Sequence, residues 1–243
     1  MTSTYFNPCL TVFDPATTDG LVGQPGLVAV VGPSAYGTYE AGDDIRFTGF
    51  YSGTARQMLG LGPRPTGWSH DDEGTCYLEE LSDFANSALA GDRSPIETLA
   101  TPIVSLTTPV AELLRLNIDA FLTEGFLRDL LTYAEERMTQ STVQVRPDLE
   151  LISATVAQDA LRVLWQAQHL IETGTMRLQI PDRDFHASFA HWTRTQRSDW
   201  FTDQVAKAWA APRALPSTAD ESRIGDIVFE HYFATVNDLG AGY

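Results

Sequence analysis

The amino-acid sequence predicts an α+β fold in which a small mixed sheet with helices is followed by a helical C-terminal half. Strand-like apolar runs lie mainly in the first third of the chain. From residue 110 onward, most of the chain has apolar residues at helical spacing. We therefore expect an α/β region over 1–105 and a helical region over 106–243 packed on it. A chain of 243 residues with 43% hydrophobic content can bury such a core.

Two strands are predicted on either side of a glycine-containing turn. Residues 27–31 (LVAVV) form a short apolar run rich in β-branched side chains, and Gly32-Pro33-Ser34 follows it. Residues 45–51 (IRFTGFY) alternate apolar and polar side chains, as a half-buried strand does. Glycines and prolines then recur among polar residues over 52–73, which predicts a long surface loop.

Helices are predicted for most of the remaining chain. Apolar spacing indicates a helix over 78–90 that Gly91 closes. A second helix is expected to begin with Ser94 as its N-cap, Pro95 in its first turn and Glu97 three residues after the cap. Gly174 is expected to end a long helix, with a brief strand at 176–180 after it. The other predicted helices span 110–118, 124–140, 154–173, 198–210 and 224–239.

Composition and charge narrow the function classes. The 16 basic residues face 32 acidic ones, a formal charge of -16, so direct binding to nucleic acid or to an anionic membrane is disfavoured. No signal peptide and no membrane-spanning run is evident. The two cysteines are too few for a disulfide scaffold, which predicts a reducing compartment and a cytoplasmic location.

The most informative segment is 31–51, VGPSAYGTYEAGDDIRFTGFY. It resembles the predicted-nucleotidyltransferase branch of the DNA polymerase beta superfamily, whose Gly-Ser-x-Ala-Tyr-Gly loop precedes Ser-Asp-x-Asp and an apolar strand containing Gly-Val. The residues in register with that pattern are Gly32, Ala35, Tyr36, Gly37, Asp44, Phe47 and Gly49. The resemblance implies a nucleotidyltransferase-type sheet.

Three further segments follow in the family's order. Residues 89–99 are similar to its Gly-Asn-Pro-x-x-x-Glu-Leu helix start, with Glu97 in the place of the glutamate. Residues 161–180 are similar to its Leu-x-x-x-Gly helix end with the strand after it, and 215–232 to its Leu-Pro-x-x-x-Asp segment. The resemblance therefore extends over most of the chain.

The resemblance also implies a chemistry from which this sequence departs. In the superfamily the loop serine contacts nucleotide phosphates, and the Asp-x-Asp pair with a third acid holds two Mg²⁺ ions, because hard divalent cations prefer carboxylate oxygens. Here Pro33 occupies the serine position, and Ser34 comes one residue late. The second acid is replaced by Arg46, whose positive charge would repel a metal ion. The third acid is expected near Thr75, with acids slightly upstream at Asp71, Asp72 and Glu73.

These features predict a candidate site and leave three functions open. The catalytic candidates are Asp43 and Asp44, and Asp44 is also the candidate ligand for Mg²⁺. The candidates for nucleotide binding are Gly32, Ser34, Tyr36, Gly37 and Arg46. Asp43-Asp44 could equally cap a turn and strand, and Arg46 could pair with Asp44 or bind a phosphate.

The first function is a diverged, nucleotide-binding or regulatory protein with an impaired metal site, a pseudoenzyme. The second is an active Mg²⁺-dependent enzyme that moves a nucleoside monophosphate from a nucleoside triphosphate to a small molecule, protein or RNA end. The third is an acidic interaction subunit that docks a basic protein partner or mimics nucleic acid. A hydrolase of the Gly-x-Ser-x-Gly type and a P-loop protein are not predicted, since both motifs are missing.

Overall fold

The computed structural model describes residues 23–39, 43–53, 67–71, 74–142 and 150–240. Backbone contacts divide the chain into two compact units. The first, here called the sheet unit, comprises residues up to Phe121 together with those from Ala219 onward. The second, the helical unit, comprises Leu122–Thr218.

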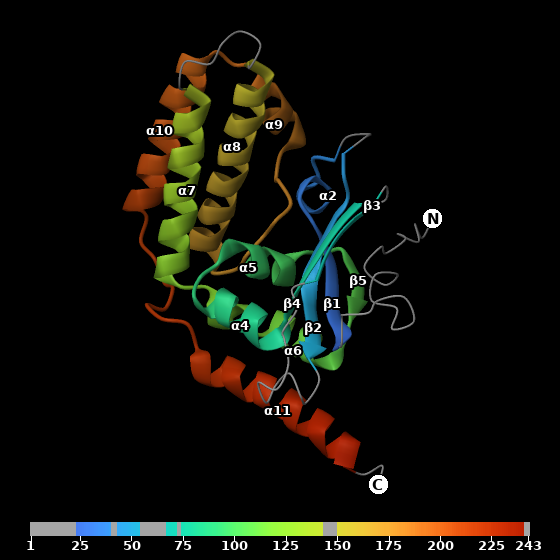
Figure 1. The fold of residues 1–243 in the computed structure, drawn as a ribbon. Coiled ribbons are helices and arrows are strands. Elements are labelled where there is room, and N and C mark those ends of the chain that lie inside the picture. Colours follow the sequence, from blue (N-terminus) through green and yellow to red (C-terminus); the bar gives the residue numbers. More distant parts are fainter. Residues whose placement is uncertain (1–22, 40–42, 54–66, 72–73, 143–149, 241–243) are drawn as a thin grey trace. The chain divides into compact units, whose positions relative to one another are not determined.

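The described part of the sheet unit forms a five-stranded mixed sheet with helices (Figure 1). The strand order is β3-β4-β2-β1-β5, in which β2 and β4 run parallel and the other neighbouring strands run antiparallel. The elements are β1 (Gly23–Val31), α2 (Pro33–Tyr36), β2 (Arg46–Gly53), β3 (Gly67–Asp71), β4 (Gly74–Glu80), α4 (Leu81–Leu89), α5 (Arg93–Ala100), β5 (Val104–Thr107), α6 (Pro109–Leu116), the 3-10 helix η1 (Ile118–Phe121) and α11 (Glu221–Gly240).

One face of the sheet carries a buried apolar cluster. Its fully buried members come from β1, β2 and β4 and are Val28, Val30, Phe47, Tyr51, Cys76 and Leu78. Gly49 lies opposite Val28 in the β1–β2 ladder. A Cβ atom at Gly49 would lie 1.8 Å from the carbonyl oxygen of Leu27, so no larger residue fits there. This close approach gives a physical reason for the glycine in the second strand.

The other face of the sheet is covered by α4 and α5 (Figure 1). The rings of Phe50 and Phe84 lie 5.2 Å apart between β2 and α4. The hydroxyl oxygens of Thr48 and Thr98 lie 2.5 Å apart and join β2 to α5 by a hydrogen bond. Residues 46, 48 and 50 alternate along β2 with the residues of the buried apolar cluster. Arg46 therefore belongs to the same side of β2 as the residues that contact α4 and α5.

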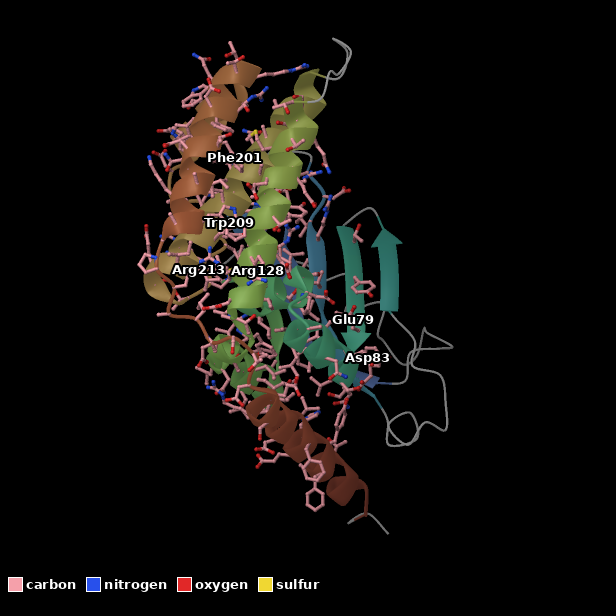
Figure 2. The ribbon with its side chains drawn as sticks, turned by 90° about the vertical axis from the view of Figure 1, so that its left-hand side faces the viewer. Glu79, Asp83, Arg128, Phe201, Trp209 and Arg213 are labelled. Carbon is pink, nitrogen blue, oxygen red and sulfur yellow. The ribbon has the colours of Figure 1, made fainter. Side chains whose placement is uncertain are left out.

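The helical unit is built on a pair of long helices. These are α7 (Glu124–Thr142) and α8 (Glu150–Thr173), which pack side by side and antiparallel, and they are followed by α9 (Arg183–Ala190) and α10 (Arg194–Ala210). Figure 2 shows Phe201 and Trp209 of α10 on the side toward α7, and Trp209 Nε1 donates to Glu135 Oε2 of α7 at 3.3 Å. Trp192 and Trp200 pack against Phe189, with ring centroids 5.3 and 5.6 Å away, so these tryptophans are packing residues.

The α+β prediction is confirmed, as are the strands around 27–31 and 45–51 and the five later helices, within a few residues. The predicted boundary after residue 105 does not coincide with the two compact units. α6, η1 and α11 belong with the sheet, and Asp220 N donates to Ala120 O at 2.9 Å where α11 joins η1. The cause is long-range packing of the last helix, which local sequence patterns do not report.

Two predictions beside the sheet are wrong. Residues 67–71, predicted as loop, form β3, which pairs antiparallel with β4. The predicted helix over 78–90 begins only at Leu81, because residues up to Glu80 extend β4, with Cys76, Leu78 and Glu80 buried at every second position. Residues 54–66 and 72–73 of the predicted loop lie outside the described residues.

Two further predictions need correction, and one helix was not predicted. α5 begins at Arg93 with Asp92 as its N-cap, so Ser94 does not cap it; Pro95 fits the first turn because the amides there have no partner within the helix. Residues 176–180 form no strand, since no strand of the described helical unit lies beside them to complete a ladder. The short helix α9 was not expected. Gly174 does end α8, in a left-handed conformation with φ of 68°.

Two observations bear on the location of the protein. No helix among the described residues is both long and apolar enough to cross a bilayer. Cys76 is buried and disulfide-bonded, so this residue does not support the predicted reducing compartment. The cytoplasmic location stays a prediction.

Candidate functional site

The glycine loop after β1 is a single helical turn closed by two glycines. Gly32 and Gly37 both have positive φ, of 75° and 80°, and Gly37 is in the left-handed helical conformation. The turn between them is α2, which has Pro33 in its first position. Only glycine adopts these backbone conformations without strain, so the loop shape depends on both.

The backbone amides of this loop are already bonded within it. Ala35 N and Tyr36 N both donate to Gly32 O, at 3.0 and 3.1 Å. Gly37 N and Thr38 N both donate to Pro33 O, and Pro33 itself has no N–H. The amides of residues 35–38 are therefore not available as a phosphate cradle. Ser34, half-buried in α2, is the one serine of the turn.

Tyr36 links the loop to α5. Its hydroxyl donates to Glu97 Oε2 at 2.8 Å, and Glu97 is buried, with 5% of its surface exposed. Arg93 Nε lies 3.6 Å from Glu97 Oε1 on the same helix. The loop tyrosine and the helix glutamate, 61 positions apart in the chain, are thus direct partners. Tyr36 and Glu97 hold the loop in place.

The two candidate acids lie just before β2. Asp43 is half-buried and Asp44 is exposed, two residues ahead of the first residue of the strand, Arg46. Arg46 pairs with Val31, the last residue of β1. The two acids, which precede Arg46, and the glycine loop, which follows Val31, therefore lie at the same end of the β1–β2 pair. A Cβ atom at Gly32 would lie 3.6 Å from Arg46 Cδ, which places the stem of the arginine against the loop.

Arg46 places a positive charge at this end of the sheet. Its side chain is exposed and forms no ion pair with any residue that the structure describes. The anticipated pairing with Asp44 is therefore not formed. Across the parallel β2–β4 ladder its partner is Thr75, the position where the third acid was expected. The three positions of the expected carboxylate set are thus aspartate, arginine and threonine.

These three positions carry one carboxylate, that of Asp44. No group of three histidine, cysteine, aspartate or glutamate side chains in the described chain is placed to hold a metal ion. Asp71 pairs with Gly74, one step beyond Thr75, and Asp72 and Glu73 lie outside the described residues. A hydroxyl and a guanidinium beside one exposed carboxylate are better suited to an anion than to Mg²⁺.

A second polar group at the opposite end of β2 and β4 was not foreseen. Here called the Glu80 cluster, it consists of Ser52, Gly53, Glu80, Ser82, His231 and Tyr232. Glu80 is 4% exposed and accepts from Ser82 N at 2.9 Å, from Gly53 N at 3.4 Å, and from the hydroxyls of Ser82 and Tyr232. Ser52 Oγ lies 2.8 Å from His231 Nε2. The cluster anchors α11 to the sheet.

The pKa values in and near this cluster follow burial. Burial raises the pKa of Tyr232, and its hydrogen bond to Glu80 raises it further. Burial lowers the pKa of His231, and the negative charge of Glu80 only partly opposes this. On β4, burial and a hydrogen bond to Glu79 raise the pKa of Tyr77 to about 12. His231 is therefore favoured in its neutral form in the folded protein.

Comparisons with known proteins give one distant likeness to report. No family model matches the sequence, and no curated protein matches it. A crystal structure of a nucleotidyltransferase-like protein from Exiguobacterium sibiricum is similar over 91% of this chain and 76% of its own, with 11% identity and a TM-score of 0.33. At that TM-score the likeness carries no argument about the site.

Proposed function

We propose that the sheet unit is a diverged nucleotidyltransferase-type unit that binds the phosphate groups of a nucleoside triphosphate without two-metal chemistry. The chain would then act as a nucleotide-binding or regulatory protein. The observation that carries this proposal is the exposed Arg46 side chain, packed on Gly32 and free of ion pairs among the described residues. A guanidinium that forms no ion pair with a described residue and lies against the glycine loop is available to an anion from solution.

The charge at this end of the sheet supports a phosphate ligand. An arginine fork can donate two parallel hydrogen bonds to phosphate oxygens, and such charge-assisted bonds are the stronger kind. A divalent cation in the same place would meet the positive charge of Arg46 at a distance where repulsion is several kcal/mol before solvent screening. Nucleotide binding therefore needs no metal bound by the three motif positions.

The loop geometry supports contacts made by side chains. Because the amides of residues 35–38 are bonded inside the loop, we assign the phosphate contacts to Ser34 Oγ and the Arg46 guanidinium. Gly32, Tyr36 and Gly37 give the loop its shape, and Tyr36 fixes it to Glu97. Asp44 keeps its predicted metal role only in the enzyme alternative.

Calorimetry with the four nucleoside triphosphates, each with and without Mg²⁺, tests this proposal. We expect at least one triphosphate to bind in the absence of Mg²⁺, and Arg46→Ala to weaken that binding about tenfold, the value of one charge-assisted contact. Arg128→Ala, which removes an exposed arginine of α7, is the control and should leave the affinity unchanged. Absence of binding by all four triphosphates would refute the proposal.

A charge reversal at Arg46 distinguishes the diverged binding protein from an active enzyme. Arg46→Asp restores the second carboxylate, and we expect it to raise Mg²⁺ or Mn²⁺ affinity by about two orders of magnitude, equivalent to about 3 kcal/mol. The wild-type chain should transfer no labelled nucleotide to an acceptor. Robust transfer that Asp44→Ala abolishes would show that the metal chemistry is intact.

The exposed apolar side chains of α6 and α11 favour a second candidate, an acidic interaction subunit. Leu116, Phe229 and Phe233 are 76, 67 and 58% exposed, and the two phenylalanine rings are stacked with centroids 6.0 Å apart. With a net charge of -16, the complementary partner would be basic and apolar. A fluorescent helical peptide of lysine and leucine is a direct probe. Under this candidate the peptide binds to the protein, and Phe229→Ser weakens the binding of the peptide. No nucleoside triphosphate binds.

A further inference from the structure

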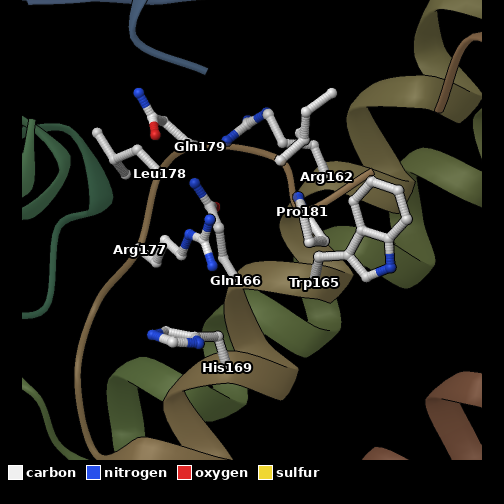
Figure 3. Close-up of a pocket in the computed structure, with 9 residues that line it drawn as sticks. Arg162, Trp165, Gln166, His169, Arg177, Leu178, Gln179 and Pro181 are labelled. Atoms are coloured by element: carbon white, nitrogen blue, oxygen red, sulfur yellow. The ribbon is translucent and has the colours of Figure 1, made fainter. Parts of the chain in front are cut away.

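The helical unit contains a small cavity between α8 and the segment that follows it. Its lining comes from α8 residues 162–169 and from residues 177–181 (Figure 3). The cavity volume is about 40 Å³. One water molecule needs about 10–15 Å³ on this measure, so the cavity has room for about three water-sized groups. That size admits only a small ligand.

Gln166 is the reason to expect a polar occupant. Its side chain lines the cavity and extends from α8 toward the segment that carries Arg177 and Pro181 (Figure 3). The residue is 2% exposed, yet neither Oε1 nor Nε2 has a hydrogen-bond partner among the described residues. A buried carboxamide without partners is destabilising by about 1–3 kcal/mol for each unpaired group. A ligand that both accepts and donates would satisfy it.

The charge of the lining indicates the sign of that ligand. Although the chain has a net charge of -16, none of the nine lining residues is acidic. Arg177 is exposed and forms no ion pair with a described residue, so its charge is available. Arg162 also lines the cavity, but its Nε and Nη2 atoms bond to Asp159 Oδ1, at 3.2 and 2.7 Å, which offsets part of its charge.

We propose that this cavity is a binding site for a small protonated oxyanion, of which inorganic phosphate is the simplest. Arg177 and Gln166 Nε2 donate to the oxygens of the anion, and Gln166 Oε1 accepts from its P–OH group. A hydrogen phosphate ion carries both kinds of group at neutral pH. Sulfate has the same shape and no proton to donate, so the carboxamide discriminates between the two.

Thermal unfolding and calorimetry at constant ionic strength, with phosphate, sulfate and acetate compared at pH 7, test the site. Phosphate should raise the midpoint of the wild-type protein, and sulfate and acetate should bind about tenfold more weakly because each lacks the donor. Arg177→Ala should weaken phosphate binding about tenfold or more. Arg128→Ala, an exposed arginine of α7 outside the lining, is the matched control.

Gln166→Met separates a ligand site from a merely solvated one. Methionine keeps the length of the side chain and removes both unpaired atoms, so the variant should fold and should be at least as stable as the wild type without phosphate. The stabilisation by phosphate should disappear. The proposal is overturned if phosphate and sulfate act equally on the wild type, or if Arg177→Ala and Arg128→Ala lose binding equally. It is also overturned if Gln166→Met retains the phosphate effect.

Discussion

The two ends of the parallel β2–β4 pair differ in how their polar groups are satisfied. At the carboxyl ends, Glu80 is buried and accepts hydrogen bonds from four donors, one of them the Tyr232 hydroxyl of α11. At the amino ends, Arg46 is exposed beside Thr75 and has no ion pair among the described residues.

This difference distinguishes structural polar groups from groups available to a ligand. Ligands of open α/β sheets usually bind beyond the carboxyl ends of the strands. Here α11 contributes Tyr232 and His231 to that end. The buried Glu80 carboxylate accepts a hydrogen bond from Tyr232 and so holds α11. The amino end, where the glycine loop and Arg46 meet, carries a charge that pairs with no described residue, and it is the end at which we propose that the ligand binds.

The largest effect on stability should come from removing the Glu80 carboxylate, at the carboxyl ends of β2 and β4. Glu80→Ala removes the N-cap of α4, worth about 1 kcal/mol, and leaves Gly53 N and the Tyr232 hydroxyl without their acceptor. We expect the free energy of unfolding to fall by about 3 kcal/mol in urea titrations followed by circular dichroism. Glu230→Ala, at an exposed position of α11, should change it little. Equal effects of the two variants would mean that the Glu80 cluster is not structural.

A smaller effect is expected at the contact that holds the glycine loop. Tyr36→Phe removes the hydroxyl that donates to the buried Glu97 carboxylate. The loss should lower the free energy of unfolding by about 1 kcal/mol, the usual value for one hydrogen bond. Tyr39→Phe, whose ring is 49% exposed, is the matched control. If Tyr36→Phe behaves like Tyr39→Phe, the loop is held by other contacts.

The amino end could be predicted from sequence to a useful extent because its residues are close in the chain. The loop and the start of β2 are separated by a few residues, and the expected third-acid position, Thr75, does lie beside Arg46. Which amides are free could not be predicted, since Pro33 O accepts from Gly37 and Thr38 only once the turn has formed. The assigned ligand roles of these residues stay predictions.

The carboxyl end could not be predicted because its partners are distant in the chain. Ser52 and His231 are 179 positions apart, and no sequence pattern joins them. The error over β4 has a different cause: Tyr77, Leu78 and Leu81 fit helical spacing, while the alternation of Cys76, Leu78 and Glu80 is satisfied only when β2 lies beside them. Periodicity alone cannot choose between the two for a short apolar segment.

A still smaller effect on stability is expected from His231 in the Glu80 cluster. The folded-state pKa of His231 lies below its ordinary value of 6.5, because burial disfavours the charged ring. The neutral form therefore stabilises the fold above pH 6.5, and this contribution is lost as the pH falls through the lowered pKa. In melting curves between pH 8 and pH 5, His231→Gln should lose less stability on acidification than the wild type.

The helical unit provides the comparison for this pH dependence. The pKa of His186 is also lowered by burial, and its ring contacts the Gln158 carbonyl at 3.2 Å. His186→Gln should therefore remove the separate contribution of that unit, and the double variant should have the flattest profile. An unchanged profile in His231→Gln would show that its protonation is not coupled to folding.

The smallest effect on stability is expected at Arg46, where the largest effect on binding is proposed. The side chain is exposed, has no ion pair among the described residues, and lies against Gly32 through its apolar stem. Arg46→Ala should therefore change the free energy of unfolding by less than about 0.5 kcal/mol. Arg115→Ala is the contrasting variant, because Arg115 Nη2 donates to Thr101 O at 2.9 Å and its loss should lower that free energy by about 1 kcal/mol. Urea titrations of both variants without ligand make the comparison. If Arg46→Ala is as destabilising as Arg115→Ala, the arginine has a structural role at the amino end, and the contrast between the two ends of the sheet is lost.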